Sequence, residues 1–396
     1  MSKIFFIIGN NTGLCRAEIF SQIKHLSGIN TPTDTSIIAN KIDTYDYCKI
    51  LNKLGGTIKI GHILSTVSSN QVLKKLPQHE FLQQLLKNDK RVVFGISSYA
   101  TKGGLNFKQI KDIGLNIKNS YRAAGQSARW VSSKENPLSS VVVTRNGLLK
   151  KGGEIVVIFD DKQAHLGHTL AVQDYQAYSS RDFGRPTRDM KQGMLPPKLA
   201  QILINLAQLK TCDTIMDPFC GGGTILQEAW LMGITNLIGS DINPQAIKST
   251  KSNLAWMRKS LNLGLKNLRL INRDVRQLNM SHNSVTAIVT EPYLGPTDLP
   301  RRSNELNKIF LDLDKLYLNS FKVFKKILRQ DGRVVIVFPR YVTKRKDYRV
   351  NIINNILKLG FELASYPNWV GQLPLVYKRP GQGIAREIYV FHKKSS

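Results

Sequence analysis

The sequence predicts an α/β fold with a mostly parallel sheet in its carboxyl-terminal half, preceded by a half of α+β character. Three observations support this prediction. After Pro196, short apolar strands alternate with amphipathic helical patterns, a rhythm typical of a parallel sheet. Before Pro196, short strands and lysine-rich helices follow no such order. The chain ends in two short strands around a glycine-bearing turn, which predicts an antiparallel hairpin at the sheet edge.

Each expected element follows from its apolar pattern. In the first half, the predicted strands are Ile4–Ile8, Val92–Ile96, Ser140–Val143 and Glu154–Phe159, and the predicted helices are Ala17–His25 and Gln109–Ala123. In the second half, the predicted parallel strands are Thr214–Met216, Asn236–Gly239, Asn267–Ile271, Ala287–Val289 and Arg333–Phe338. Apolar residues three or four apart between these strands indicate helices, and the closing hairpin pairs Leu375–Tyr377 with Ile388–Phe391.

Length and hydropathy limit the class of protein. The 396 residues are enough for two or three domains, because one hydrophobic core rarely grows past a few hundred residues. Ser179 to Pro197 mixes charges, glycine and proline with little apolar periodicity, which predicts a linker. No apolar run approaches the roughly 20 residues that cross a bilayer, so we expect a soluble protein without a membrane partner.

The charge predicts a polyanionic partner. Lys and Arg total 57 against 28 Asp and Glu, a formal net charge of +29, which favours binding to nucleic acid. The lysine-rich composition typical of AT-rich genomes accounts for part of this excess. Cysteines at positions 15, 48, 212 and 220 have neither the spacing of a zinc site nor that of a disulfide framework. We therefore expect reduced thiols, a cytoplasmic location and no metal.

A glycine-rich turn follows the first strand of the second half. The strand runs into Asp217, then Phe219, then Gly221 to Gly223, and a helix begins near Thr224. Glycine lets the backbone approach a ligand, and a helix start presents free backbone N–H groups. Alone, this turn is weak evidence, because three glycines also form an ordinary tight turn.

Two further acids turn this feature into a cofactor prediction. Asp241 ends the second strand, where a carboxylate binds ribose hydroxyls, and Asp274 follows the third, where it accepts from an adenine amine. Leu226 replaces the third glycine of a dinucleotide motif, and no Gly-Lys-Ser/Thr phosphate loop is present. An adenosine ligand without a pyrophosphate remains, namely S-adenosylmethionine. The predicted cofactor residues are Asp217, Phe219, Gly221, Gly223, Thr224, Asp241, Ile242, Asp274 and Val275.

The predicted catalytic residues directly follow the fourth strand and are Thr290, Glu291, Pro292 and Tyr293. This run is similar to the Asp/Asn-Pro-Pro-Tyr turn of methyltransferases that modify exocyclic amines of bases. The resemblance implies that the first side-chain oxygen and the next carbonyl accept hydrogen bonds from the amine, while the aromatic ring stacks on an extruded base. Thr290 and Glu291 depart from the pattern. We expect the Thr290 hydroxyl to be the acceptor and Glu291 to be a general base, with loss of activity as the alternative.

The resemblance extends along the chain. Arg185–Asp189 and Gly193–Ala200 resemble the linker and the first helix of the methyltransferase domain in the tRNA guanosine-10 methyltransferase family, which modifies the 2-amino group of guanine. Phe5–Asn10 resembles that family's ferredoxin-like domain, and Val93–Ser97 and Thr169–Asp174 resemble its RNA-binding THUMP domain.

The resemblance implies four segments: a ferredoxin-like domain over residues 1–75, a THUMP domain over 76–172, a linker over 173–195 and a Rossmann-fold methyltransferase domain over 196–396. The expected reaction is S-adenosylmethionine-dependent methylation of the guanine 2-amino group in tRNA, at position 10. Methylation of amines in rRNA or DNA, and a non-catalytic RNA-binding protein that retains the cofactor, are the alternatives. Some relatives need a small activator subunit, and the sequence fixes neither this requirement nor the oligomeric state.

Overall fold

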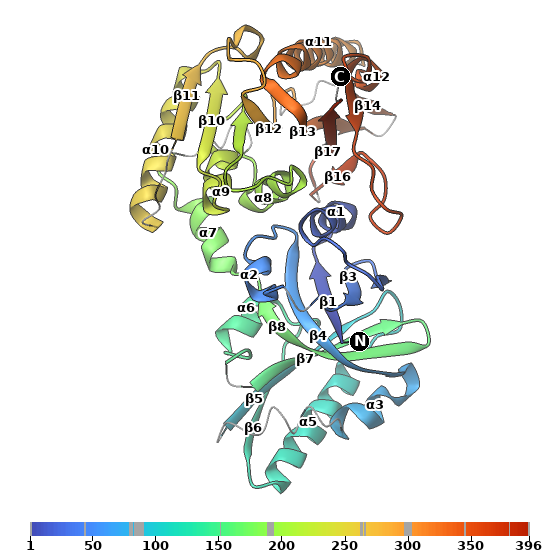
Figure 1. Cartoon of the computed structure of the whole chain (residues 1–396). Helices are drawn as coiled ribbons and strands as arrows, with labels where there is room; N and C mark the ends of the chain where they lie inside the picture. Colours follow the sequence, from blue (N-terminus) through green and yellow to red (C-terminus); the bar gives the residue numbers. More distant parts are fainter. Residues whose placement is uncertain are drawn as a thin grey trace. The chain divides into compact units, whose positions relative to one another are not determined.

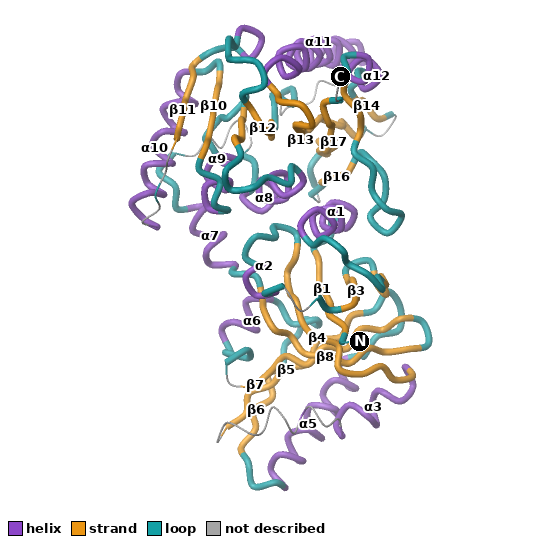
Figure 2. The backbone as a smooth tube through the Cα atoms, in the orientation of Figure 1, coloured by secondary structure: helices purple, strands orange, loops and turns teal. Residues whose placement is uncertain are grey.

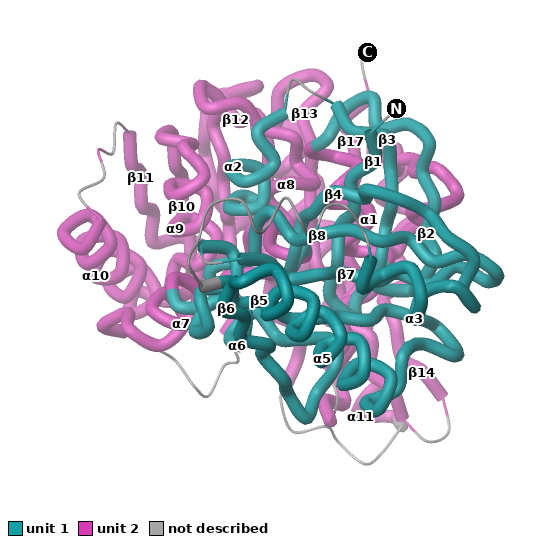
Figure 3. The backbone as a smooth tube through the Cα atoms, turned by 90° about the horizontal axis from the view of Figure 1, so that it is seen from below, with its two compact units in different colours: residues 1–12, 23–53, 57–176 teal, residues 13–22, 54–56, 177–396 magenta. Residues whose placement is uncertain are grey.

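The computed structural model describes residues 2–42, 45–78, 82, 91–150, 152–187, 194–261, 264, 267–296, 303–343, 346–379 and 381–394. These residues form two compact units (Figure 3). The first unit contains Met1–Thr12, Ile23–Lys53 and Thr57–Gln176; the second contains Gly13–Gln22, Leu54–Gly56 and Ala177–Ser396. The linker prediction falls partly outside the described residues, because Arg188, Asp189 and Gly193 are not among them.

The first unit is built on one eight-stranded sheet with the order β2-β3-β1-β4-β8-β7-β5-β6. The strands are β1 (Lys3–Ile8), β2 (Asn30–Thr33), β3 (Ser36–Asn40), β4 (Thr57–Ser68), β5 (Arg91–Tyr99), β6 (Ser127–Val131), β7 (Gly152–Asp160) and β8 (Gln163–Val172). Pairing is antiparallel except that β5 runs parallel to both β6 and β7. Since β4 pairs with β8, one sheet joins the predicted ferredoxin-like and THUMP segments, and their division stays a prediction.

Among the described residues, the helices that accompany this sheet are α2 (Tyr47–Leu51), α3 (Val72–Lys75), α5 (Phe107–Ala123) and α6 (Ser140–Arg145). Helix α5 lies along the sheet (Figure 2) and buries Ile110, Ile113 and Ile117 against strand residues of β5 and β7. The sequence prediction of a strand at Ser140–Val143 is wrong, because these residues form α6. The Ser139 side chain accepts a hydrogen bond from the Val142 backbone N at 3.3 Å, and this N-cap outweighs the strand preference of three valines.

The second unit contains a nine-stranded sheet with the order β11-β10-β9-β12-β13-β17-β15, with β14 on β13 and β16 on β17. The strands are β9 (Thr214–Asp217), β10 (Asn236–Asp241), β11 (Asn267–Asn272), β12 (Val285–Thr290), β13 (Leu328–Val342), β14 (Asp347–Arg349), β15 (Phe361–Leu363), β16 (Leu375–Tyr377) and β17 (Ile384–Lys393). Strands β9 to β13 are mutually parallel, and β17 runs antiparallel to β13 and β16. The predicted parallel sheet and its antiparallel closing hairpin are confirmed.

Helices cover both faces of this sheet (Figure 1). Helices α8 (Pro197–Leu206), α9 (Thr224–Leu231) and α10 (Pro244–Leu261) pack on one face, and α11 (Ser303–Ile327) and α12 (Ile353–Lys358) pack on the other. Neighbouring strand residues divide between the two cores: Ile215 and Val335 face the first set of helices, and Met216 and Ile336 face the second. Both faces are thereby buried, which leaves the carboxyl ends of the parallel strands as the edge where polar residues gather.

Two short helical segments complete the second unit. Helix α1 (Thr12–Gln22) groups with it although it lies near the amino terminus of the chain, and so does α7 (Tyr175–Phe183) from Ala177 onward. Within the described ranges, no helix is both long and apolar enough to span a membrane.

Candidate functional site

The glycine-rich turn follows β9 and starts α9. Gly221 and Gly223 have φ angles of 51° and 78°, in the left-handed region that favours glycine, and Gly223 is the N-cap of α9. A Cβ on Gly223 would lie 2.8 Å from Thr250 Cγ2, so this position excludes a larger residue. A Cβ on Gly221 would meet no atom within 4 Å, so the backbone borders open space beside the helix start.

Helix α10 holds this turn through two polar side chains that the sequence reasoning missed. The Thr250 hydroxyl donates to the Gly221 carbonyl at 2.8 Å, and Asn253 Nδ2 donates to the Gly222 carbonyl at 2.9 Å. Both side chains are fully buried in α10, three residues apart and hence on one helix face. Polar residues within the apolar stripe of a predicted helix were the signal available in the sequence. The turn that they contact could be identified only from the folded structure.

Residues of the predicted linker bind the same turn. The Asn253 Oδ1 atom accepts from the Thr187 backbone N at 3.1 Å, and Arg185 Nη1 donates to the Thr224 hydroxyl at 2.7 Å. Arg185 is 4% exposed. The linker residues from Ala177 to Thr187 are thus part of the second unit, and Arg185 and Thr187 contact the start of α9 and its neighbour α10.

Asp241, at the carboxyl end of β10, accepts two backbone hydrogen bonds at the predicted cofactor edge. Its Oδ2 accepts from Gly221 N at 2.9 Å, and its Oδ1 accepts from Asn243 N at 2.9 Å. The next side chain, Ile242, is 67% exposed. The structure therefore brings Asp241 to the glycine turn, beside an apolar surface large enough to contact a planar ring.

Asp274 follows the end of β11 and forms an ion pair with Arg276. Arg276 Nε lies 3.0 Å from each Asp274 carboxylate oxygen, and Arg276 Nη2 lies 2.5 Å from Oδ2. These hydrogen bonds from Arg276 hold the pKa of Asp274 below its usual value. Val275 is buried. Arg276 thus orients Asp274, and the predicted hydrogen bond from an adenine amine to this carboxylate stays a prediction.

Thr290 ends β12 and joins the two predicted turns. Its hydroxyl donates to Asp217 Oδ1 at 2.7 Å, and the same oxygen accepts from Phe219 N at 3.1 Å. Burial raises the pKa of Asp217 to about 7. The Thr290 side chain is fully buried, so its hydroxyl faces the protein interior rather than an incoming amine. The expected role of Thr290 as the amine acceptor stays a prediction.

Glu291 is paired with an arginine that the sequence reasoning did not identify. Arg386 Nε lies 2.5 Å from Glu291 Oε2, Arg386 Nη2 lies 3.2 Å from Oε1, and each side chain is 12% exposed. A two-point arginine pair fixes the orientation of the carboxylate. The role of Glu291 as the general base expected from the sequence stays a prediction.

The rest of the turn exposes an aromatic ring on a fixed backbone. Tyr293 is 58% exposed, while Pro292 is buried. The Tyr317 hydroxyl donates to the Tyr293 carbonyl at 2.6 Å, and the Tyr341 hydroxyl donates to the Leu294 carbonyl at 2.9 Å. An exposed ring on an anchored backbone is suited to stacking on another planar group.

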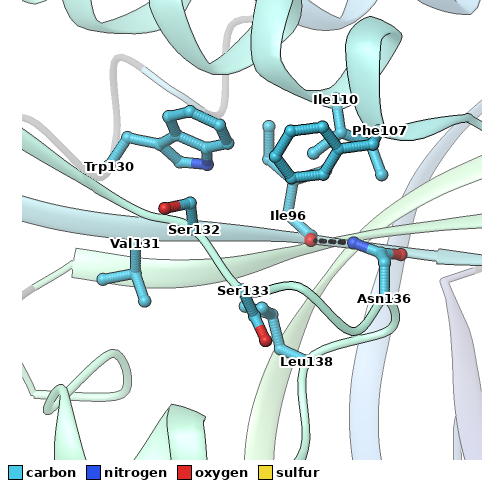
Figure 4. Close-up of a pocket in the computed structure, with 9 residues that line it drawn as sticks. All are labelled: Ile96, Phe107, Ile110, Trp130, Val131, Ser132, Ser133, Asn136 and Leu138. Atoms are coloured by element: carbon cyan, nitrogen blue, oxygen red, sulfur yellow. Dashed lines mark hydrogen bonds between the residues drawn. The ribbon is translucent and has the colours of Figure 1, made fainter.

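A separate pocket lies in the first unit (Figure 4). The Asn136 side-chain amide donates to the Ile96 carbonyl at 2.8 Å and orders one wall of the pocket. The lining residues are Ile96, Phe107, Ile110, Trp130, Val131, Ser132, Ser133, Asn136 and Leu138. None of the predicted cofactor or catalytic residues lines it, so this pocket gives no support to the predicted site.

Sequence comparison places the second unit in a known group. Residues 185–351 match the UPF0020 family, described as an RMKL-like methyltransferase domain. A probable tRNA (guanine(10)-N2)-dimethyltransferase of Methanothermococcus thermolithotrophicus is 34% identical over 157 residues, which cover 37% of this chain and 91% of that protein. The tRNA (guanine(10)-N2)-dimethyltransferase of Methanothermobacter thermautotrophicus is 38% identical over 122 residues, which cover 30% of this chain and only 34% of that relative.

Solved structures share the fold over nearly the whole chain. TrmN from Thermus thermophilus has a TM-score of 0.55 at 17% identity and covers 99% of this chain and 100% of its own. The putative methyltransferase SMU.472, complexed with SAH, has a TM-score of 0.54 at 11% identity and covers 100% of both chains. The second unit thus has the Rossmann-type fold of S-adenosylmethionine-dependent methyltransferases, and the chain belongs to the tRNA (guanine(10)-N2)-dimethyltransferase family.

Proposed function

We propose that this protein methylates the exocyclic 2-amino group of a guanine in tRNA, at position 10, with S-adenosylmethionine as the methyl donor. The observation that carries the proposal is the hydrogen bond from Thr290 to Asp217. It joins the turn after β12 to the turn after β9, so a donor bound at one turn and an acceptor base at the other would be neighbours. Family membership supplies the class of substrate.

The residues at the first turn fit an adenosine-containing donor. Open space beside Gly221 admits a ligand close to the backbone, the Asp241 carboxylate retains lone pairs for ribose hydroxyls, and exposed Ile242 offers an apolar surface to adenine. When bound, S-adenosylmethionine supplies a methyl carbon that the guanine nitrogen attacks as the carbon–sulfur bond breaks toward sulfur. The proposed donor residues are Asp217, Phe219, Gly221, Gly223, Thr224, Asp241, Ile242, Asp274 and Val275.

On the acceptor side, the protein contributes orientation and charge. The Glu291 carboxylate accepts an N–H of the guanine amine, which localises the nitrogen lone pair that the ring otherwise withdraws. Tyr293 stacks on the extruded base, and Pro292 fixes the backbone between them. After transfer, the methylated nitrogen releases one proton to water, so Glu291 does not have to take it. Thr290 acts as a positioning residue through Asp217.

The surplus of 57 Lys and Arg over 28 Asp and Glu supports a nucleic-acid substrate, because basic surfaces gain affinity by releasing counterions from phosphates. All four cysteines are free thiols, which fits a cytoplasmic site of action on tRNA. Methylation of rRNA remains the neighbouring alternative, since its guanines present the same amine.

The experiment is a methyl-transfer assay with the full chain and labelled S-adenosylmethionine. The substrates are a transcribed tRNA with guanosine at position 10 and the same tRNA with inosine there, which lacks only the 2-amino group. We expect label in the first RNA and none at position 10 of the second, with the modified nucleoside identified by mass spectrometry. Absence of label across tRNA, rRNA and DNA would contradict the proposal.

A further inference from the structure

We propose that Arg386 is a positioning residue for the acceptor site: it holds the Glu291 carboxylate aimed at the guanine amine. This inference rests on the proposed function and adds a residue from the closing hairpin to it. Arg386 lies on β17, 95 positions from Glu291, and lies opposite Pro339 of β13 and Tyr377 of β16.

The geometry of the pair fixes the carboxylate. Two guanidinium nitrogens of Arg386 reach two different oxygens of Glu291, at 2.5 and 3.2 Å. A planar fork that binds both oxygens restricts rotation of the carboxylate, which a single-point lysine contact does not do. Each oxygen keeps a further lone pair for a second donor. The pair therefore orients Glu291 without using up its capacity to accept from an amine.

The two faces of β17 show that the pair belongs to the acceptor turn. Adjacent strand residues point to opposite faces of a sheet. Glu387, the neighbour of Arg386, has its Oε1 atom 3.3 Å from Arg349 Nε, in a pair that includes no residue of the acceptor turn. Glu387 also lies 4.0 Å from Arg340 Nη1, so among the described residues its ion pairs are with Arg340 and Arg349, whereas the pair of Arg386 is with the predicted catalytic residue Glu291. Arg349 therefore provides a matched control.

Charged and titratable groups around Glu291 explain why it needs a cation. Arg386 faces it from β17, Asp217 from β9 and Tyr317 from α11, and Tyr377 of β16 lies near Arg386. Burial, with smaller contributions from the charges of Asp241 and Glu291, raises the pKa of Asp217 to about 7. Without Arg386, the largely buried Glu291 carboxylate would face another acid with no cation between them, and it would lose the two hydrogen bonds that orient it.

A merely structural ion pair would behave differently. Removing one partner of a buried ion pair costs stability, so loss of Arg386 from a purely structural site would lower the melting temperature and leave kcat alone. A positioning role instead predicts a fall in kcat, with little change in the affinity for either substrate.

The test compares Arg386→Gln, Arg386→Lys and the control Arg349→Gln in the full chain, with S-adenosylmethionine and the tRNA transcript as probes. For Arg386→Gln we expect kcat to fall by about 10- to 100-fold, with KM for tRNA and Kd for S-adenosylmethionine within about threefold of wild type. Arg386→Lys should recover part of the lost kcat, and Arg349→Gln should match wild type.

The outcomes separate this inference from the proposed function. A wild-type protein that labels no RNA overturns the proposed function and this role with it. An active wild type whose Arg386→Gln variant keeps the same kcat overturns only the role of Arg386. If Arg386→Gln does not fold, as judged by circular dichroism, Arg386→Lys decides: a lower kcat with unchanged KM and Kd supports the role, and a wild-type kcat overturns it.

Discussion

The turn after β9 and the turn after β12 lie at the same edge of one sheet, yet they are stabilised in different ways. The first depends on glycine conformations and on side chains of β10 and α10 that bind its backbone, namely Asp241, Thr250 and Asn253. The second depends on side chains delivered from distant strands and helices, namely Asp217, Tyr317, Tyr341 and Arg386. A donor site of the first kind is recognisable from residue spacing. An acceptor site of the second kind becomes visible only when the chain is folded.

This contrast predicts that substitutions at the two turns affect different measurements. Changes at the first turn should weaken cofactor binding or the fold, because the backbone itself forms the site. Changes at the second should lower kcat at saturating substrate, because side-chain charge acts on the reacting amine.

The largest expected effect is at Glu291. Replacement by Ala removes the acceptor and should lower kcat by about 10²–10³-fold, the range seen when one group that stabilises developing charge is lost. Replacement by Gln keeps a side-chain oxygen and should retain kcat within about tenfold. Steady-state assays on tRNA, with calorimetric binding of S-adenosylmethionine as a control, measure both. Equal and complete loss in the Gln and Ala variants would instead favour the general base.

A second effect concerns stability and pH at Asp217. Its pKa of about 7 in the folded protein exceeds the ordinary value of 3.8, so between these values the folded state holds a proton that the unfolded state has released. The resulting stability is complete below about pH 4 and is lost as the pH rises through about 7, by roughly 1.4 kcal/mol per unit at most. Asp217→Asn should remove this slope.

Urea unfolding of wild type and Asp217→Asn at pH 4.5 to 8 measures that difference. Glu18 and Glu228 also have pKa values raised to about 7 by burial, but they titrate in both proteins, so the difference isolates Asp217. Parallel stability curves for the two proteins would show that Asp217 does not titrate in this range.

A smaller effect is expected for Asp241→Asn. The amide leaves one of the two backbone donors, Gly221 N or Asn243 N, without a matched acceptor, and it removes the charge beside the ribose position. We expect S-adenosylmethionine to bind about 10-fold more weakly, with kcat at saturation near wild type. Titration calorimetry with the cofactor alone tests this expectation. A fall in kcat with unchanged Kd would contradict the expectation that changes at the first turn act on cofactor binding.

The smallest effect is expected for Gly223→Ala. The left-handed backbone disfavours alanine by about 1–2 kcal/mol, and the added Cβ would lie 2.8 Å from Thr250 Cγ2. Gly233→Ala is the matched control, because Gly233 has φ 91° and its added Cβ would lie an ordinary 3.5 Å from Thr211. Thermal unfolding should show the larger loss of stability for Gly223→Ala. Equal losses for the two variants would mean that the turn shifts enough to relieve the contact between the added Cβ and Thr250.

Much of the second unit was predictable from local patterns. Predicted strands such as Asn236–Gly239 and Arg333–Phe338 are confirmed as β10 and β13, because a buried parallel strand requires a short apolar run. The strand predicted at Ser140–Val143 is wrong, because the N-cap residue Ser139 stabilises a helix in this run of valines. The grouping of α1 with the second unit was likewise not predictable, because it depends on packing between segments far apart in the chain.

The sequence by itself determined the α/β class, the glycine turn and the acids at the strand ends, because backbone conformation and side-chain alternation are local properties. The tertiary structure decided which side chains contact the acceptor turn. It buried the Thr290 hydroxyl against Asp217 and brought Arg386 to Glu291 across 95 positions of sequence. No periodicity encodes such a pair, because its formation depends on the order in which the sheet places β9, β12, β13 and β17 beside one another.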